Sequence, residues 1–322
     1  MAYFYVTRIR DGQGQEGLRI LECRGLDGRA EIPEQLAGLP VRELAPYLFS
    51  AHKDYDALPE PEAFWTGPEE TAVSLPLIKG DRLEELRLPS GLRKVGAYAL
   101  YNCESCRKLE FYSTIEDWGA GVFTGCRGIR RLTVHEEAGH RSCFQEVLTE
   151  IRQTLRVEYL GEVQARLIFP EFFEEAVENT PARILVTETH GCGKQYRNAF
   201  AQNHFSFREY DRLFPYVQVQ EPEDLVLELA AGRLMVPGQL TEEARQTYME
   251  YLQKSAAAAT SLAVRRQNME LLNWLLSHLA YRGEQLDQAL DDAGRLGDAG
   301  ASAVLMEQRR RLGAAVRHRF QL

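Results

Sequence analysis

The chain has 322 residues, and at roughly 150 residues per domain this length predicts about two domains. Hydrophobic residues make up 44% and charged residues 26% of the sequence, proportions that exclude disorder over the whole length. Lys and Arg total 38 against 47 Asp and Glu, and the resulting net charge of −9 argues against a protein whose main work is binding nucleic acid.

The apolar segments are short. The longest, such as the one around Leu271 and Leu276, is broken by Asn273 and falls far short of the roughly 18 residues that span a bilayer. Residues 1–10 also lack the apolar core of a secretory signal. We therefore expect a cytoplasmic protein without membrane contact, whose six cysteines stay reduced.

A 23-residue period organises the first half of the chain, relating Leu86 to Leu109 and Leu132. The same interval relates Leu83 with Cys106 and Ile129, Leu88 with Phe111 and Val134, Leu92 with Ile115, Val95 with Trp118, Gly96 with Gly119, Ala99 with Val122, Leu100 with Phe123, and Cys103 with Cys126. Alternating apolar residues at the start of each unit predict a short strand. The three- and four-residue apolar steps that follow predict a helical or 3₁₀ turn. Such a unit buries its apolar side only by stacking on its neighbours.

The segments that carry this period are similar to a known family. Residues 88–103 (LPSGLRKVGAYALYNC) and 115–126 (IEDWGAGVFTGC) resemble the BspA-type bacterial leucine-rich repeats, and residues 32–49 look like a degenerate opening repeat. The resemblance covers residues 20–135 and implies a short solenoid of about three units. Because the family includes surface adhesins and intracellular proteins with no known role, it also leaves a surface adhesin as an alternative function.

The first unit carries an insertion. Leu86 follows Phe49 by 37 residues, whereas Leu109 follows Leu100 by 9, so the insertion has 28 residues. Insertions in solenoids leave from one face and often belong to binding. Within residues 50–81, the candidates for contacting a protein partner are Tyr55, Phe64, Trp65, Glu69 and Glu70. The alternative is that the insertion covers the apolar end of the solenoid, with Trp65 as its anchor.

The 23-residue spacing stops near Arg141. Residues 156–160 and 165–169 predict two short strands, which we interpret as a closing cap that protects the open edge. From Pro170 onward, apolar residues recur at helical steps, and 265–312 faintly resembles ankyrin-type helices. The expected fold class is α+β. A leucine-rich-repeat domain at 1–169 is followed by an all-α domain at 170–322, built as a bundle or short α-solenoid.

Two cysteine patterns invite a chemical interpretation. Cys103 and Cys106 have the spacing of a redox pair or half a zinc site, but both belong to the repeat and no second pair follows, which predicts small buried core residues. His190, Cys192 and His204 offer potential metal ligands, yet the local sequence supplies no fourth ligand for zinc. We expect no cofactor and no metal.

The sequence therefore favours a non-enzymatic protein-protein interaction or scaffold protein. Its leucine-rich-repeat surface would bind an unidentified protein partner, with no nucleic-acid partner. The alternative from another class is an enzyme or metal-binding protein with a site near His190 and Cys192, where an activated thiol would act as the nucleophile. No pattern in the sequence indicates an oligomeric state.

Overall fold

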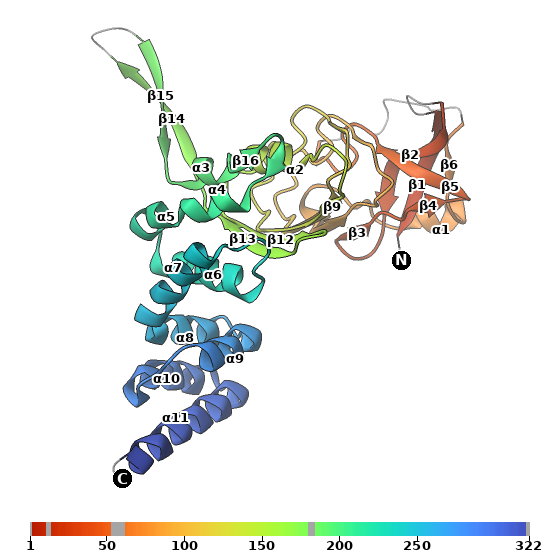
Figure 1. The fold of residues 1–322 in the computed structure, drawn as a ribbon. Coiled ribbons are helices and arrows are strands. Elements are labelled where there is room, and N and C mark those ends of the chain that lie inside the picture. The colour runs from red at the N-terminus through yellow and green to blue at the C-terminus, as the bar shows by residue number, and fades with distance from the viewer. Residues whose placement is uncertain (1, 11–13, 53–61, 180–183, 320–322) are drawn as a thin grey trace. The chain divides into compact units, whose positions relative to one another are not determined.

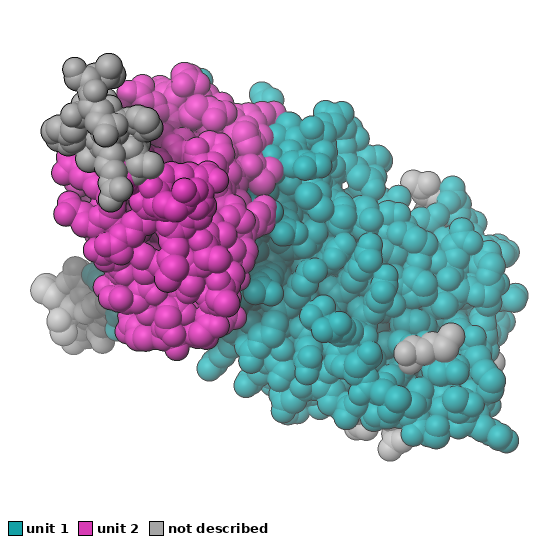
Figure 2. Space-filling model, turned by 90° about the horizontal axis from the view of Figure 1, so that it is seen from below, with its two compact units in different colours: residues 1–210 teal, residues 211–322 magenta. Residues whose placement is uncertain are grey.

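The chain divides into two compact units, residues 1–210 and 211–322 (Figure 2). The structure, a computed structural model, describes residues 2–10, 14–52, 62–179 and 184–319. The strands lie in the first unit, and the second is helical (Figure 1). These findings agree with the expected α+β class. Among the described residues, no helix is both long enough and apolar enough to cross a bilayer.

One sheet contains the N-terminal hairpin and has the order β10-β8-β5-β2-β1-β6. Its strands are β1 (Tyr3–Arg10), β2 (Glu16–Arg24), β5 (Leu39–Leu44), β6 (Phe64–Trp65), β8 (Lys94–Val95) and β10 (Asp117–Trp118), with β4 (Gln35–Leu36) paired to β5. β1 and β2 are antiparallel, and Val6 and Ile20, which pair with each other, are fully buried in the core. β5, β8 and β10 are parallel. They form a column of short strands where the sequence predicted a turn, because Leu44, Val95 and Trp118 align in register.

The repeat sheet has the order β13-β12-β11-β9-β7-β3. Its strands are β3 (Arg29–Glu31), β7 (Glu85–Arg87), β9 (Lys108–Tyr112), β11 (Arg131–His135), β12 (Leu155–Leu160) and β13 (Ala165–Phe169). Parallel pairing places Leu86 beside Leu109 and Leu109 beside Leu132. All three are at most 1% exposed. The predicted stacking of 23-residue units is therefore confirmed.

The closing cap is smaller than the sequence predicted. β12 pairs parallel with β11 and places Val157 beside Leu132, so it continues the ladder. Only β13 reverses direction, pairing antiparallel with β12. The helix α2 (Phe144–Glu150) connects β11 to β12. The spacing from Leu132 to Val157 is 25 residues, which hides this rung from a search at a fixed interval.

Successive units touch backbone to backbone at one corner. A Cβ atom on Gly96 would lie 2.3 Å from the Pro46 nitrogen, and one on Gly119 would lie 2.4 Å from the Ala97 nitrogen. Real Cβ atoms do not approach other atoms so closely. Glycine is required at these positions because the neighbouring backbone occupies the space of a side chain.

We expect Gly119→Ala to destabilise the first unit by about 2–3 kcal/mol, because backbone atoms must move to admit the methyl group. Urea unfolding followed by circular dichroism measures this change. Gly283→Ala is the matched control, since a Cβ there meets nothing within 4 Å. Equal unfolding midpoints for the two variants would contradict the close stacking.

The segment after Pro170 forms strands where helices were predicted. β14 (Phe173–Asn179) and β15 (Ile184–His190) make an antiparallel hairpin that pairs Ala176 with Thr187. The prediction of helices here is wrong. The β-branched residues of β15 favour an extended chain, and β14 becomes a strand by pairing with it. The first unit continues to residue 210 through α3 (Gly193–Arg197), β16 (Phe200–Ala201), β17 (His204–Phe205) and the start of α4 (Phe207–Arg212).

Arg197 connects several backbone segments at the C-terminal end of the repeat sheet. Its side chain is 1% exposed, and its guanidinium donates to the backbone carbonyls of Leu148, Ile151, Gln153, Pro170 and Gly193. Burial lowers the pKa of Arg197 to about 10, so the group stays charged at neutral pH. The cation lies at the carboxyl end of α2, where the helix dipole favours positive charge.

Arg197→Met should cost on the order of 3–5 kcal/mol in the free energy of unfolding, because it leaves several buried carbonyls without donors. Thermal and urea unfolding measure the loss. Arg152→Met is the control, because Arg152 lies over the same Phe172 ring but is 55% exposed. Its loss should stay below about 1 kcal/mol. Similar losses for both variants would mean that the carbonyl contacts contribute little.

Tyr210 covers the last strand of the repeat sheet. Its hydroxyl accepts a hydrogen bond from the Ile168 amide at 2.8 Å and donates one to the Ile168 carbonyl at 2.7 Å. The tyrosine is fully buried. It therefore takes the backbone bonds that another strand would make to β13 at this position.

The second unit is a succession of helices, which confirms the expected helical C-terminal region. They are α5 (Phe214–Gln220), α6 (Glu223–Met235), α7 (Glu242–Lys254), α8 (Ala256–Arg265), α9 (Met269–His278), α10 (Asp287–Leu296) and α11 (Ala299–Arg319). Short 3₁₀ helices occupy Gly80–Arg82 in the first unit and Gly283–Leu286 in the second.

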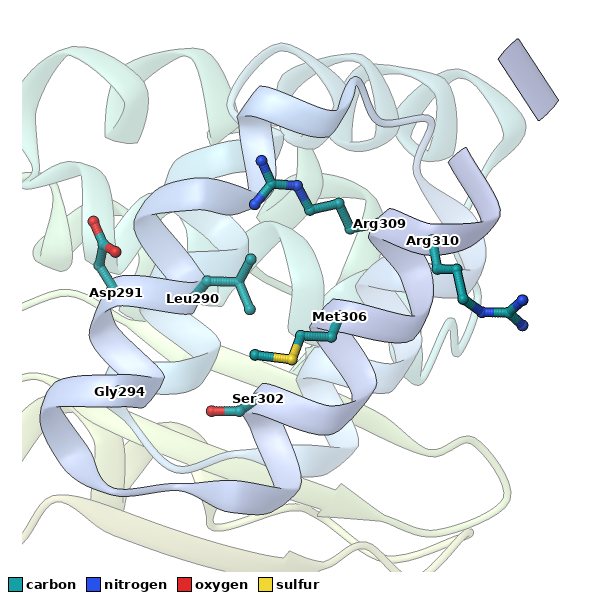
Figure 3. Close-up of a pocket in the computed structure, with 7 residues that line it drawn as sticks. All are labelled: Leu290, Asp291, Gly294, Ser302, Met306, Arg309 and Arg310. Atoms are coloured by element: carbon teal, nitrogen blue, oxygen red, sulfur yellow. The ribbon is translucent and has the colours of Figure 1, made fainter. Parts of the chain in front are cut away.

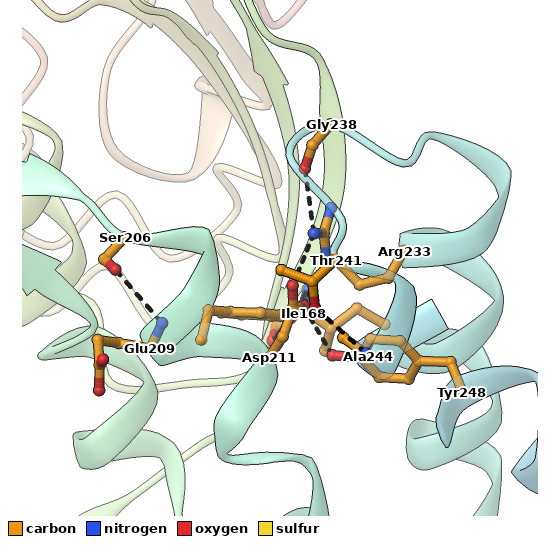
Figure 4. Close-up of polar contacts among 10 residues, drawn as sticks. Ile168, Ser206, Glu209, Asp211, Arg233, Gly238, Thr241, Ala244 and Tyr248 are labelled. Atoms are coloured by element: carbon orange, nitrogen blue, oxygen red, sulfur yellow. Dashed lines mark hydrogen bonds and ion pairs between the residues drawn. The ribbon is translucent and has the colours of Figure 1, made fainter. Parts of the chain in front are cut away.

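A buried ion pair connects the first helices of this unit (Figure 4). Arg233 of α6 donates to both carboxylate oxygens of Asp211 at 2.8 and 2.9 Å and to the Gly238 carbonyl at 3.1 Å. The hydroxyl of Tyr248 on α7 donates to Asp211 at 2.9 Å. Asp211, Arg233 and Tyr248 are all buried. A buried charge needs such partners because the interior does not solvate it.

Candidate interaction surface

The outward side chains of the repeat sheet form straight rows, because parallel pairing in register aligns equivalent positions. We call this surface the repeat face. One row contains Glu85, Lys108, Arg131 and Arg156, and the next contains Arg87, Glu110, Thr133 and Glu158. Between them along each strand lie the buried residues of the core. The repeat face is therefore polar and charged above an apolar interior.

Glu110 is the common acceptor of ion pairs with residues of β7, β9 and β11 on the repeat face. Its carboxylate lies 3.2 Å from the Arg87 Nε, 3.0 Å from the His135 Nε2 and 3.8 Å from the Lys108 Nζ. Arg87 also pairs with Glu31 at 3.1 Å. The charges on β3, β7 and β9 consequently satisfy one another across the strands.

Arg131 differs from its neighbours. It is exposed, and it forms no ion pair with a residue that the structure describes. On the sheet it lies between Lys108 and Arg156, so three cations follow one another across adjacent strands. Like charges at this spacing repel, and an anionic group from outside would relieve that repulsion. Arg131 is the centre of the positive part of the repeat face.

An aromatic pair borders these rows. The rings of Tyr112 and His135 are stacked, with centroids 4.4 Å apart, because the register places the two residues on adjacent strands. Partial burial, and then the nearby Glu34 carboxylate, raises the pKa of the Tyr112 hydroxyl. Like an ordinary tyrosine, the hydroxyl is protonated at neutral pH, and it is available as a donor or an acceptor.

Comparison with known families identifies the repeats. A family model described as a BspA type leucine rich repeat region matches residues 78–162 with six copies. This region is a BspA-type leucine-rich repeat. The match extends beyond residue 135 and includes the rung β12, which the sequence interpretation assigned to the cap.

The chain is similar to a leucine rich cell surface protein from Faecalibacterium prausnitzii A2-165, with 13% identity and a TM-score of 0.25. That match covers 48% of this chain and 41% of the other protein, less than half of its length. No curated protein matches the chain.

The cysteines of the BspA-type repeats belong to the core, as the sequence predicted. Cys103 and Cys106 are fully buried and free, and the Cys103 thiol lies 3.1 Å from the Phe49 carbonyl. Burial raises the pKa of Cys106 to about 12, which keeps its thiol protonated. A protonated thiol is neither a nucleophile nor a metal ligand.

The residues of the insertion that were predicted to contact a partner differ in secondary structure and in exposure. Phe64 and Trp65 form β6, which pairs with β1, and the Trp65 ring lies 5.0 Å from Tyr5 and 5.6 Å from the Arg24 guanidinium. Glu69 and Glu70 are exposed in the first turn of α1 (Glu69–Ser74). Tyr55 lies outside the described residues.

We expect Trp65→Ala to destabilise the first unit by about 1–2 kcal/mol, because the ring packs against Tyr5 and Arg24. Urea unfolding tests this cover role. Glu70→Ala, a change to an exposed residue of the same insertion, should stay within about 0.5 kcal/mol. If Trp65→Ala left stability unchanged and removed a captured partner, the ring would be a binding residue.

The residues of the alternative metal or enzyme site do not form a cluster of ligands. Cys192 is 1% exposed and precedes α3. His190 stacks on Phe173 at 4.5 Å, and its Nε2 lies 3.8 Å from Glu175. His204 is exposed on β17. Among the described residues, no group of three His, Cys, Asp or Glu side chains is placed to hold a metal ion.

The repeat face was missed at the sequence level, although its signal was present. Lys108 and Arg131 occupy the polar position before the repeated leucines, at the same 23-residue interval. Reading the polar positions of the period alongside the apolar ones would have placed these cations next to each other. The ion pairs that engage Lys108 but not Arg131 have no sequence signal, because they depend on side chains from three strands.

Proposed function

We propose that the chain is a non-enzymatic protein-protein interaction or scaffold protein that binds a protein partner through its repeat face. The observation that carries the proposal is the row Lys108, Arg131 and Arg156 on adjacent rungs, with Arg131 exposed. The rungs are held by their stacked backbones, so little backbone ordering is needed on binding. An acidic segment of a partner matches this row in charge.

A second contact region is proposed at the insertion. Exposed Glu69 and Glu70 are available to a partner, whereas Phe64 and Trp65 are half-buried against the N-terminal sheet. We place the protein in the cytoplasm, because its six cysteines are buried and form no disulfide, as in proteins of reducing compartments. Cell fractionation tests this location.

The repeat face is tested with Arg131→Glu, which reverses the charge at the centre of the cation row. Affinity capture from a lysate of the source cells, quantified by mass spectrometry, should show a partner that the wild type retains. The variant should retain at least about tenfold less, which corresponds to about 1.4 kcal/mol of binding energy.

Arg245→Glu is the matched control for this capture. Arg245 is an exposed residue of α7 in the helical unit, and its replacement changes the net charge equally. It should leave the captured partner unchanged. If Arg245→Glu and Arg131→Glu reduced capture equally, only the overall charge would matter, and the repeat face would not be the binding surface.

A further inference from the structure

The last two helical layers of the second unit repeat at a 30-residue interval. Gln267 and Gly297 are separated by 30 positions, and both adopt left-handed φ angles of 52° and 67°. The residues that follow them, Asn268 and Asp298, both cap a helix. Each accepts a hydrogen bond from the amide three positions further on, at 3.0 and 2.9 Å respectively. α9 and α11 are therefore equivalent helices of successive layers.

Positions that are equivalent in α9 and α11 differ in their exposure to solvent. Leu275 and Leu305 are separated by the same 30 residues, and both are fully buried. Leu276 of α9 is 9% exposed, whereas its equivalent in α11, Met306, is 62% exposed. α11 lies over Leu276, as the hydrogen bond from the Gln308 side chain to the Leu276 carbonyl at 3.4 Å shows. No described helix covers Met306 in the same way.

An open groove runs between α10 and α11 at this uncovered layer. It has a volume of about 550 Å³. Figure 3 shows Leu290 of α10 and Met306 of α11 pointing toward each other across it. The apolar area here is what another helical layer would bury.

The two walls of the groove carry opposite charges. Asp291 on α10 forms no ion pair with a described residue. Arg309 on α11 is 54% exposed and pairs with Asp287 at 3.1 Å. A twofold axis that runs along the groove would place α10 of one copy opposite α11 of the other, with Asp291 of each copy opposite the wall that carries Arg309. The groove is therefore complementary to itself in charge as well as apolar at its centre.

We propose that the groove between α10 and α11 is a self-association surface that binds the same groove of a second copy of this chain. The second copy supplies the helical layer that covers Met306. This interface is separate from the repeat face and goes beyond the proposed function.

The first test measures the mass of the full chain by sedimentation velocity at about 100 µM, where a dimer with a micromolar Kd is formed. The wild type should be a dimer. Met306→Glu should raise the dissociation constant at least about tenfold, because it places a charge in the apolar centre. Val219→Glu is the control, since Val219 is 86% exposed on α5, outside the groove. It should remain dimeric.

The second test uses charge exchange between Asp291 and Arg309. Asp291→Arg alone and Arg309→Glu alone each place like charges on both sides of the axis, so each variant should be monomeric. Mixed in equal amounts, the two variants should form a heterodimer, because both cross-axis pairs are then opposite in sign. Native mass spectrometry distinguishes the species when one variant carries a tag.

The outcomes are decisive in either direction. A monomeric wild type would overturn the proposal, as would a wild-type dimer that Met306→Glu leaves intact. Failure of the mixed variants to pair would show that Asp291 does not face Arg309 across a twofold axis, which also overturns it. Loss of partner capture with Arg131→Glu is an independent measurement, so the two proposals can fail separately.

Discussion

The structure depends on the stacking of successive repeat backbones at one fixed spacing. Gly96 and Gly119 mark where the backbones meet, with no space for a side chain. This contact sets the register, and the register determines which residues face the core and which face outward. The buried leucines, the thiol of Cys103 and the exposed cation of Arg131 are all positioned by the same constraint.

The repeat could be predicted from sequence because the constraint acts on each unit in the same way. Leu86, Leu109 and Leu132 must satisfy equal environments, so their spacing is visible without a structure. The hairpin of β14 and β15 could not be predicted in this way. Phe173 and Val177 fit helical steps, and only their pairing with a strand later in the chain makes the segment extended.

Only part of the candidate interaction surface could be predicted from the sequence. The aromatic residues of the insertion suggested a partner-binding site, but the Trp65 ring packs on Tyr5 and Arg24. The cations of the repeat face follow the same period as the core, but the partners of Glu110 come from β7, β9 and β11. Arg197 likewise binds carbonyls from several segments, a role that no local pattern of residues indicates.

The Tyr210 hydroxyl has a consequence for where this solenoid can be lengthened. Because it already satisfies the backbone of Ile168 on the outer side of β13, a new rung cannot be appended there without displacing the tyrosine. A further unit fits instead inside the ladder, between β7 and β11, where the parallel strands pair in the same register on both sides. The number of units is then free to change while both ends keep their structure.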